Sequence, residues 1–125
     1  IRQDRAQFFK EFFPSFYGNG LLGGGVSEGI LHWSWKMAMQ ASLKATLDCV
    51  DAFGKTDFTA DMGAIACETL AIHGTRDATV PIEATAHRVA RLVPGAELIE
   101  YDGAAHGVTA SHAAKLTEDL KRFLA

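Results

Sequence analysis

The stretch ETLAIHGTRDATVP, residues 68–81, decides the fold. It opens with a short, largely apolar run that ends in His73-Gly74, which is typical of a buried strand followed by a loop. Pro81 closes the loop, and residues 82–92 contain no glycine or proline and have the composition of a helix. The stretch therefore predicts a strand, a polar loop and a helix in succession.

The same order repeats further along the chain. The run AELIEY, residues 96–101, predicts a second strand, and residues 110–124 predict a final helix with apolar side chains on one face. Two strands joined by a helix lie parallel in one sheet, with a right-handed crossover and cover on both faces. The sequence therefore predicts an α/β fold. Two strands alone cannot form such a sheet, so we expect further strands from polypeptide outside these 125 residues or from a second copy of the chain.

The chain before about residue 60 has a different, aromatic and helical character. Residues 2–13 predict a phenylalanine-rich helix, which Pro14 ends. Residues 16–29 are dominated by glycine and predict a loop. Residues 30–53 contain no glycine or proline and predict one long helix.

The overall composition is that of a globular protein and excludes several classes of partner. Hydrophobic residues make up 48% and charged residues 22%, which argues against disorder. The formal net charge is −3 and no segment gathers lysine and arginine, which argues against binding to nucleic acid or to an anionic membrane. No apolar run approaches the roughly 20 residues that span a bilayer. A small molecule is therefore the expected partner.

Two cysteines indicate a cellular compartment. Cys49 and Cys67 lie among apolar neighbours in the sequence. Such a pair suits buried thiols in a reducing compartment better than a disulfide framework. We therefore expect a cytoplasmic protein with buried thiols.

The residues that can carry chemistry follow the two predicted strands. HGTRDATVP, with Asp77, follows the first strand, and DGAAHG, with His106, follows the second. Catalytic groups in open α/β sheets gather beyond the carboxyl ends of the strands, so these two side chains are expected side by side. A histidine that is hydrogen-bonded to a buried carboxylate can act as the general base for a serine hydroxyl. The order Asp, then His, late in the chain is that of α/β-hydrolases.

Each of these polar residues also has a simpler interpretation. Asp77 can close an Asx turn or cap the following helix, and this role is compatible with catalysis. Asp102 is a rival acid, but its loop favours a role in a turn. His73 is expected to support the loop through hydrogen bonds. A metal site built from His73, Asp77 and His106 is weakly supported, because no clustered His/Cys spacing accompanies it.

Several sequence blocks together resemble a known family. HGTRDATVP and DGAAHG, preceded by DRAQF, SFYG, ASLKATLDC and KTDF, resemble the C-terminal half of the cofactor-free, non-haem haloperoxidase and aryl-esterase branch of the α/β-hydrolase fold. The similarity covers essentially all of residues 1–125. It implies a serine hydrolase with a helical cap that acts on carboxylic esters and often makes peracids from hydrogen peroxide. It also implies that no haem, metal or other cofactor takes part.

The resemblance gives a domain division and the two catalytic roles. Residues 1–60 resemble the end of the cap, and residues 61–125 resemble the last two strands and their helices. Asp77 matches the acid of the family's triad and His106 matches its base. The nucleophile of the family lies upstream of the cap, in a segment that these 125 residues lack.

The resemblance also suggests which side chains bind the substrate. Phe12 and Phe16 match aromatic positions that line the acyl pocket, and Thr79 and Ile82 match pocket positions beyond the acid. Thr75 departs from the family, because many members carry a further Asp there. This departure leaves Asp77 as the single carboxylate in its loop.

One serine in the chain imitates a nucleophile motif. GVSEG, residues 25–29, matches the G-x-S-x-G pattern of a nucleophile elbow. A working elbow needs a buried strand before the serine, and the preceding YGNGLLGGG is too rich in glycine to supply one. We therefore expect Ser27 to lie in a cap loop near the start of a helix.

Two hypotheses about function follow. In the first, the chain supplies Asp77 and His106 to a carboxylic-ester hydrolase with perhydrolase or haloperoxidase side activity, and the N-terminal half, as a separate chain or as missing residues, supplies the serine. In the alternative, the chain is a non-catalytic, truncated or degenerate hydrolase-like module that binds a ligand or assembles with itself.

Overall fold

The computed structural model describes residues 1–20 and 24–125 of the chain. None of the helices it describes is long and apolar enough to cross a membrane. The elements, in chain order, are α1 (Arg5–Tyr17), α2 (Glu28–Gln40), α3 (Leu43–Lys55), the 3₁₀ turn η1 (Met62–Ala64), β1 (Leu70–Gly74), the 3₁₀ turn η2 (Ile82–Ala84), α4 (Ala86–Leu92), β2 (Glu97–Tyr101), α5 (Val108–Ser111) and α6 (Ala113–Leu124).

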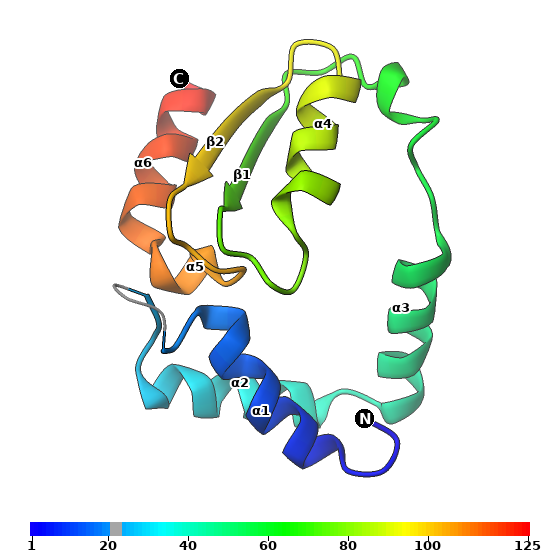
Figure 1. Cartoon of the computed structure of the whole chain (residues 1–125), viewed down its shortest axis with the longest axis vertical. Coiled ribbons are helices and arrows are strands. Elements are labelled where there is room, and N and C mark those ends of the chain that lie inside the picture. Colours follow the sequence, from blue (N-terminus) through cyan, green and yellow to red (C-terminus); the bar gives the residue numbers. More distant parts are fainter. Residues whose placement is uncertain (21–23) are drawn as a thin grey trace.

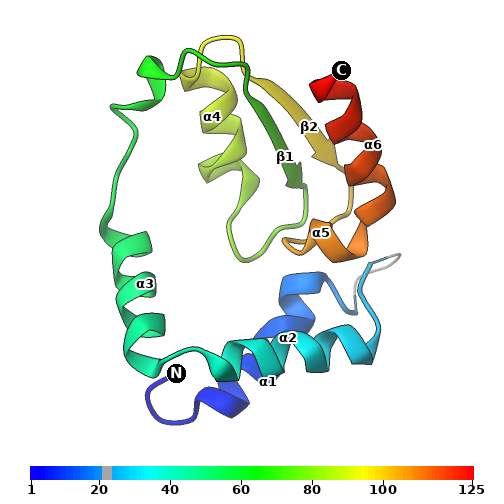
Figure 2. The same cartoon turned by 180° about the vertical axis from the view of Figure 1, so that it is seen from behind.

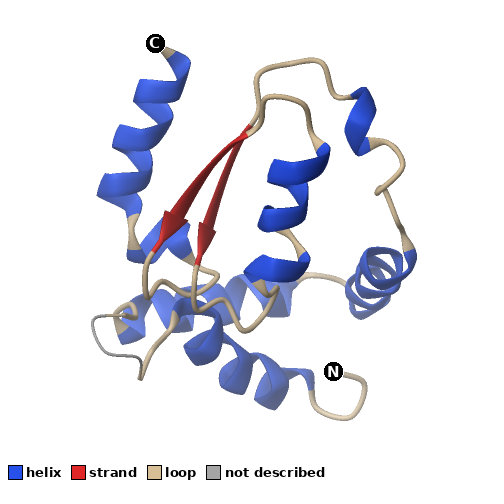
Figure 3. Cartoon of the chain, turned by 45° about the horizontal axis from the view of Figure 1, so that its top comes forward, coloured by secondary structure: helices blue, strands red, loops and turns tan. Residues whose placement is uncertain are grey.

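The two strands form a parallel pair between helices. Strand β1 pairs with β2 in parallel, with Leu70 opposite Glu97 and Gly74 opposite Tyr101. Helix α4 connects the strands and lies on one side of the pair, and α6 lies on the other side (Figure 1, Figure 3). The α/β fold and both predicted strands are confirmed.

The N-terminal helices lie at the end of the strand pair where the polar loops emerge. Both strands point with their carboxyl ends toward α1 and α2, and the view from behind shows the same arrangement (Figure 1, Figure 2). Helix α5 lies at this end and contacts α1. The loops that follow β1 and β2 therefore face the first helices of the chain.

Helix α1 does not end at Pro14, so that prediction is wrong. The helix begins after Asp4, whose side chain accepts a hydrogen bond from the Gln7 amide (2.8 Å), and it continues through Pro14 to Tyr17. It ends at Gly18, which has a left-handed φ of 76° and donates its amide to carbonyls of the last turn. A proline removes one helical hydrogen bond, but packing of α1 against α2 and the glycine cap keep the helix intact.

The long helix predicted for residues 30–53 is interrupted. Helix α2 ends at Gln40, and α3 begins after Ser42, which is extended (φ −61°, ψ 134°) and accepts a hydrogen bond from the Ala45 amide (3.3 Å). The guanidinium of Arg5 binds the carbonyl oxygens of Met39 (3.2 Å) and Ala41 (2.6 Å) at the break. A serine cap and a cation from another helix stabilise two helices here instead of one.

The last predicted helix is also divided. It starts earlier than expected, as α5, and His112 (φ −128°, ψ 30°) separates this short turn from α6. The Ser111 hydroxyl contacts His112 Nδ1 at 2.8 Å at the break. Local polar contacts again override a continuous apolar pattern.

The prediction of buried thiols is wrong for this chain. Cys49 and Cys67 are both free and exposed. Cys49 lies on α3, where the neighbouring Val50 and Phe53 are 55% and 76% exposed. The apolar neighbours of Cys49 thus lie on an exposed face instead of in a core.

The core lies between β2, α4 and α6 and contains a buried polar anchor. Tyr101 is 2% exposed, and its hydroxyl donates to Asp119 Oδ2 (2.7 Å). Burial and this hydrogen bond raise the pKa of Tyr101 to about 12. Lys115 (2.9 Å) and Arg122 (2.9 Å) also bind Asp119, and hydrogen bonds from Lys115 and Tyr101 lower the pKa of its carboxyl. The hydrogen bond between Tyr101 and Asp119 thus connects β2 to α6.

The predicted loop over residues 16–29 is partly described. The prediction is wrong at both ends, because residues 16–17 belong to α1 and residues 28–29 belong to α2, and residues 21–23 lie outside the described residues. On either side of them, the Asn19 side chain donates to the Val26 carbonyl (2.8 Å) and accepts from the Val26 amide (3.1 Å). One asparagine therefore joins the two ends of this loop.

Candidate active site

The loops after β1 and β2 are joined along their backbones. The Thr75 amide donates to the Tyr101 carbonyl (3.0 Å), and the Gly103 amide donates to the Thr75 hydroxyl (2.9 Å). A Cβ on Gly74 would stand 2.3 Å from the Ala104 carbonyl oxygen, so only glycine permits this approach. The parallel pairing of β1 and β2 and the missing side chain at Gly74 thus bring the two loops into contact at one end of the strands.

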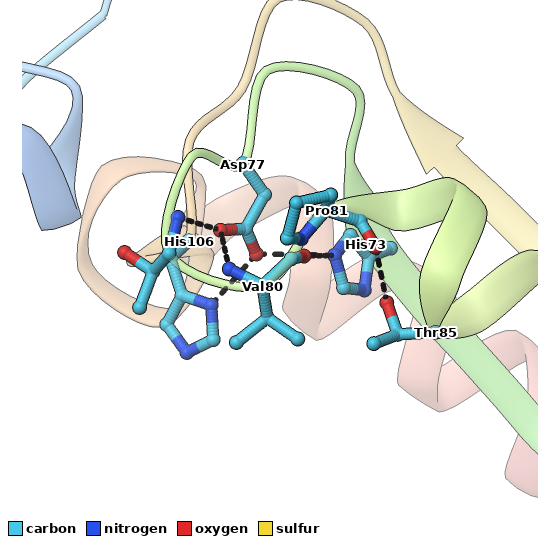
Figure 4. Close-up of polar contacts among 7 residues, drawn as sticks. His73, Asp77, Val80, Pro81, Thr85 and His106 are labelled. Carbon is cyan, nitrogen blue, oxygen red and sulfur yellow. Dashed lines mark hydrogen bonds and ion pairs between the residues drawn. The ribbon is translucent and has the colours of Figure 1, made fainter. Parts of the chain in front are cut away.

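This arrangement places Asp77 against His106. The distance between His106 Nδ1 and Asp77 Oδ2 is 2.7 Å. The Asp77 side chain is 2% exposed, and the His106 side chain is 34% exposed. The expected juxtaposition of these two residues is present, with the carboxylate inside and the imidazole at the surface of the chain (Figure 4).

The second oxygen of Asp77 holds its own loop. Asp77 Oδ1 accepts hydrogen bonds from the amides of Thr79 and Val80, each at 2.8 Å. This is the turn-closing role that the sequence allowed for Asp77, and the other oxygen of the same carboxylate contacts His106. The carboxylate is therefore fixed in orientation by backbone groups.

A second histidine reaches the same carboxylate. His73 Nε2 lies 2.9 Å from the Val80 carbonyl oxygen and 3.0 Å from Asp77 Oδ2. The predicted support of the loop by His73 is confirmed. Asp77 lies between the two imidazole rings in Figure 4.

The hydrogen bond to Asp77 determines which nitrogen of His106 can act. An ionised carboxylate only accepts, so His106 Nδ1 carries the hydrogen of this contact. The other nitrogen, Nε2, is then the one without a proton in the neutral ring. The arrangement can therefore take up a proton at Nε2 and stabilise the resulting imidazolium through Asp77.

Asp102 does not compete for this role. Its Oδ1 accepts a hydrogen bond from the Thr75 hydroxyl (3.3 Å), and the residue is exposed in the turn after β2. The carboxylate of Asp77 instead contacts His106. The prediction of a turn residue at position 102 is confirmed.

Aromatic side chains of α1 reach the histidine. The rings of Phe16 and His106 are 4.7 Å apart between centroids, and Phe12 is 5.4 Å from Phe16. Thr79 is exposed beside the acid, and Ile82 is buried in η2 with 4% exposure. The structure brings Phe16 to the histidine, while a role of these four residues in substrate binding stays a prediction.

The chain matches known proteins over nearly all of its length. The non-heme chloroperoxidase CPO-A1 of Kitasatospora aureofaciens is 38% identical over 126 residues, which is 99% of this chain and 46% of that protein. The bifunctional esterase/perhydrolase DCH of Acinetobacter calcoaceticus is 36% identical over 98% of this chain and 45% of that protein. The crystal structure of the bromoperoxidase from Bacillus anthracis has a TM-score of 0.90 at 38% identity, over 98% of this chain and 45% of that one.

This chain is similar over nearly all of its length to non-haem haloperoxidases, and it has the fold of the C-terminal half of the α/β-hydrolases. It spans about half the length of the curated relatives it matches. The match is to the C-terminal half of the hydrolase fold, as the sequence motifs indicated. No family model matches the chain.

The position of Ser27 agrees with the sequence-based expectation. Its hydroxyl accepts a hydrogen bond from the Ile30 amide (3.3 Å) and so caps the start of α2. The described residues directly before it, 24–26, are not in a strand. Ser27 is therefore the N-cap of a helix, and the described residues show no strand leading to it of the kind that a nucleophile elbow requires.

The metal alternative has no geometric support in the described part of the chain. No group of three or more His, Cys, Asp or Glu side chains there is arranged to hold a metal ion. Both His73 and His106 instead direct a ring nitrogen to one oxygen of Asp77.

Sequence reasoning missed a second glycine at the site. A Cβ on Gly107 would stand 2.2 Å from Cδ1 of the Tyr17 ring, and the Gly107 amide donates to the Phe16 carbonyl (2.8 Å). This glycine packs the histidine loop of the hydrolase against α1. The signal was present, because His73 and His106 are each followed directly by glycine.

Proposed function

We propose that this chain supplies the acid, Asp77, and the base, His106, of a carboxylic-ester hydrolase whose serine lies in polypeptide outside these 125 residues. The observation that carries the proposal is the 2.7 Å contact between His106 Nδ1 and the buried Asp77 carboxylate. Such a pair is what a serine hydroxyl requires for activation near neutral pH. The family, whose relatives include the esterase/perhydrolase DCH, supports an ester as substrate.

The reaction follows from the protonation states of the pair. His106 Nε2 takes the proton of the serine hydroxyl as its oxygen attacks the ester carbonyl, and Asp77 stabilises the imidazolium that forms. The imidazolium then gives the proton to the departing alkoxide, which leaves as the alcohol and leaves an acyl-serine. The same base activates water, which releases the carboxylic acid and restores the serine.

Perhydrolysis is a variation of the second half of this reaction. When hydrogen peroxide takes the place of water, His106 removes a proton from the peroxide and the product is a peracid. The peracid can oxidise a halide, and this would account for the haloperoxidase names of the relatives. This route needs no cofactor.

The proposed partner polypeptide is the remainder of the hydrolase. Apolar side chains of the described residues are exposed, among them Phe53 (76%) and Trp33 (61%). In the described residues, the parallel pair of β1 and β2 has no further strand beside it, whereas parallel sheets normally contain more strands. A polypeptide equivalent to the other half of the relatives, in the same or a separate chain, would supply the missing strands and the nucleophile.

The assignment of the acid is tested by two matched substitutions. In the complete hydrolase, Asp77→Asn is expected to lower kcat for a p-nitrophenyl ester by roughly 10⁴-fold, because the histidine loses its tautomer and charge partner. Asp102→Asn, in the neighbouring loop, is expected to leave kcat unchanged. Equal losses in both variants would refute Asp77 as the acid.

The source of the nucleophile is tested by covalent labelling. An active-site phosphonate is expected to modify a serine of the completing polypeptide and to leave Ser27 unmodified, as read by peptide mass spectrometry. Ser27→Ala serves as the control and is expected to be labelled as the wild type. Modification of Ser27 contradicts the proposal, and ligand binding with neither labelling nor turnover favours the non-catalytic module.

A further inference from the structure

We propose that His73 is a positioning residue of this hydrolase, which holds the Asp77 carboxylate for His106 and reduces the negative charge that His106 meets. The inference rests on the proposed roles of Asp77 and His106. It concerns a side chain that makes no contact with the reacting atoms in the mechanism above. The argument depends on one carboxylate oxygen that two imidazoles share (Figure 4).

Four nitrogen atoms surround the carboxylate of Asp77. His106 Nδ1 (2.7 Å) and His73 Nε2 (3.0 Å) meet at Oδ2, and two backbone amides, those of Thr79 and Val80, meet at Oδ1. Three of these groups form hydrogen bonds to the carboxylate, and His73 Nε2 lies in close contact with Oδ2 while it is hydrogen-bonded to the Val80 carbonyl. His73 is therefore the one side chain that shares an oxygen with His106.

The contact of His73 with a carbonyl fixes its role as a donor. The Val80 carbonyl can only accept, and it lies 2.9 Å from His73 Nε2, so this nitrogen carries a hydrogen. The same nitrogen lies 3.0 Å from Asp77 Oδ2, and the Val80 residue that it binds donates its own amide to Asp77 Oδ1. The His73 side chain is 15% exposed and belongs to β1, which limits its movement.

Sharing the oxygen has a chemical consequence for the base. The partly positive Nε2–H of His73 lies beside Oδ2 and offsets part of its negative charge, and this weakens the stabilisation that Asp77 offers to a protonated His106. Loss of the His73 donor leaves more charge on Oδ2 and strengthens the bond from His106 Nδ1.

Other groups around His106 come from the elements packed against its loop. Helix α1 contributes the apolar Phe16 ring, and the phenol of Tyr17 binds Ser34 (2.8 Å). Asp102 is exposed and bonded to Thr75. The titratable side chains that meet at Oδ2 are His73 and His106 themselves, so a change at His73 acts on His106 through Asp77.

The experiment uses the complete hydrolase with three variants. His73→Leu removes the imidazole, and His73→Gln keeps an N–H at this position. His87→Leu is a control that removes an imidazole on α4, which is bonded to Glu100 of β2 and has no contact with Asp77. The acid limb of the pH profile of kcat/KM is measured with a p-nitrophenyl ester. In parallel, NMR of histidine labelled with ¹³C and ¹⁵N follows the His106 titration and the Nδ1 proton without any substrate.

His73→Leu is expected to move the acid limb and the His106 titration midpoint to higher pH, to move the Nδ1 proton downfield, and to lower kcat/KM at neutral pH roughly tenfold. His73→Gln is expected to restore most of each effect, and His87→Leu to change none. A uniform loss of kcat/KM without movement of the limb or midpoint would overturn the proposal, since packing alone would explain it.

Two further NMR results test the proposal without relying on the activity of the His73→Leu variant. In the wild type, NMR is expected to show a proton on His73 Nε2 in the neutral ring, and a bare Nε2 would overturn the proposal even when His73→Leu does not fold. The titration is independent of turnover. A shifted His106 midpoint in a hydrolase without ester turnover would therefore support this inference while refuting the proposed function.

Discussion

Replacing Gly107 by alanine tests how closely the histidine loop packs on α1. The added Cβ would stand 2.2 Å from Cδ1 and 2.6 Å from Cε1 of the Tyr17 ring. Carbon atoms in contact are about 3.5 Å apart, so the ring would have to retreat by about 1.3 Å. The Tyr17 hydroxyl is bonded to Ser34, which is 3% exposed, and this contact resists the movement.

The backbone itself does not oppose the substitution. Gly107 has a φ of −76°, and the Val108 amide donates to the His106 carbonyl (2.8 Å), which is the pattern of an inverse γ-turn. Any residue can adopt this turn. The cost of Gly107→Ala is therefore one of overpacking, about 1–3 kcal/mol of unfolding free energy.

A double-mutant cycle separates the clash from other effects. Urea unfolding of the complete hydrolase is measured for the wild type, Gly107→Ala, Tyr17→Ala and the double variant. When the ring is absent, Gly107→Ala is expected to cost less than about 0.5 kcal/mol, because its methyl group then meets open space. An equal cost in both backgrounds would refute the reasoning that the clash with Tyr17 determines the effect.

Two further predictions concern the strand pair. Gly74→Ala is expected to reduce soluble folded protein, measured by size-exclusion chromatography, because its Cβ would meet the backbone oxygen of Ala104 at 2.3 Å; unchanged yield would contradict the close approach. Unfolding free energy, followed by urea titration, is expected to decline above pH 10 and toward about pH 12, because the pKa of Tyr101 is raised in the folded state and the folded protein holds this proton more tightly. The lowered pKa of Asp119 affects stability at acidic pH. Its contribution to the unfolding free energy is present above pH 3.8, the ordinary pKa of an aspartate, and is lost as the pH falls below this value. Tyr101→Phe is expected to remove its part of the alkaline decline, and an identical decline in that variant would contradict the assignment.

Sequence patterns predicted the strand pair and the Asp77–His106 contact for a simple reason. Short apolar runs mark the strands, and parallel pairing then brings the residues after each strand to one end of the sheet. The position of the two residues depends on local sequence and on one topological rule. Once both loops lie at this end of the sheet, the side chains of Asp77 and His106 are within reach of each other, and the structure places His106 Nδ1 2.7 Å from Asp77 Oδ2.

The helix ends were harder to predict because distant contacts decide them. The break at Ala41 is stabilised by the guanidinium of Arg5, which is distant in the sequence. Pro14 is accommodated within α1 because Gly18 closes the helix one turn later. Neither interaction can be recognised from the spacing of apolar residues. Helix propensity alone therefore favoured one long helix over residues 30–53 and an end of the first helix at Pro14.

The exposure of the cysteines could not be predicted from this chain alone. Cys49 has apolar neighbours in the sequence, and such neighbours usually indicate burial. On α3 they lie at the surface of the described residues, as Phe53 does with 76% exposure. The division at residue 60 and the substrate-binding residues stay predictions, because they depend on the rest of the hydrolase.

The contact between Gly107 and the end of α1 links the position of α1 to that of His106. The Gly107 amide is bonded to the Phe16 carbonyl, and the His106 ring lies against the Phe16 ring at a tilt. A displacement of α1 away from the sheet would therefore break these contacts or pull His106 from the Asp77 carboxylate. If the proposed function holds, substrate entry is expected to leave α1 in place.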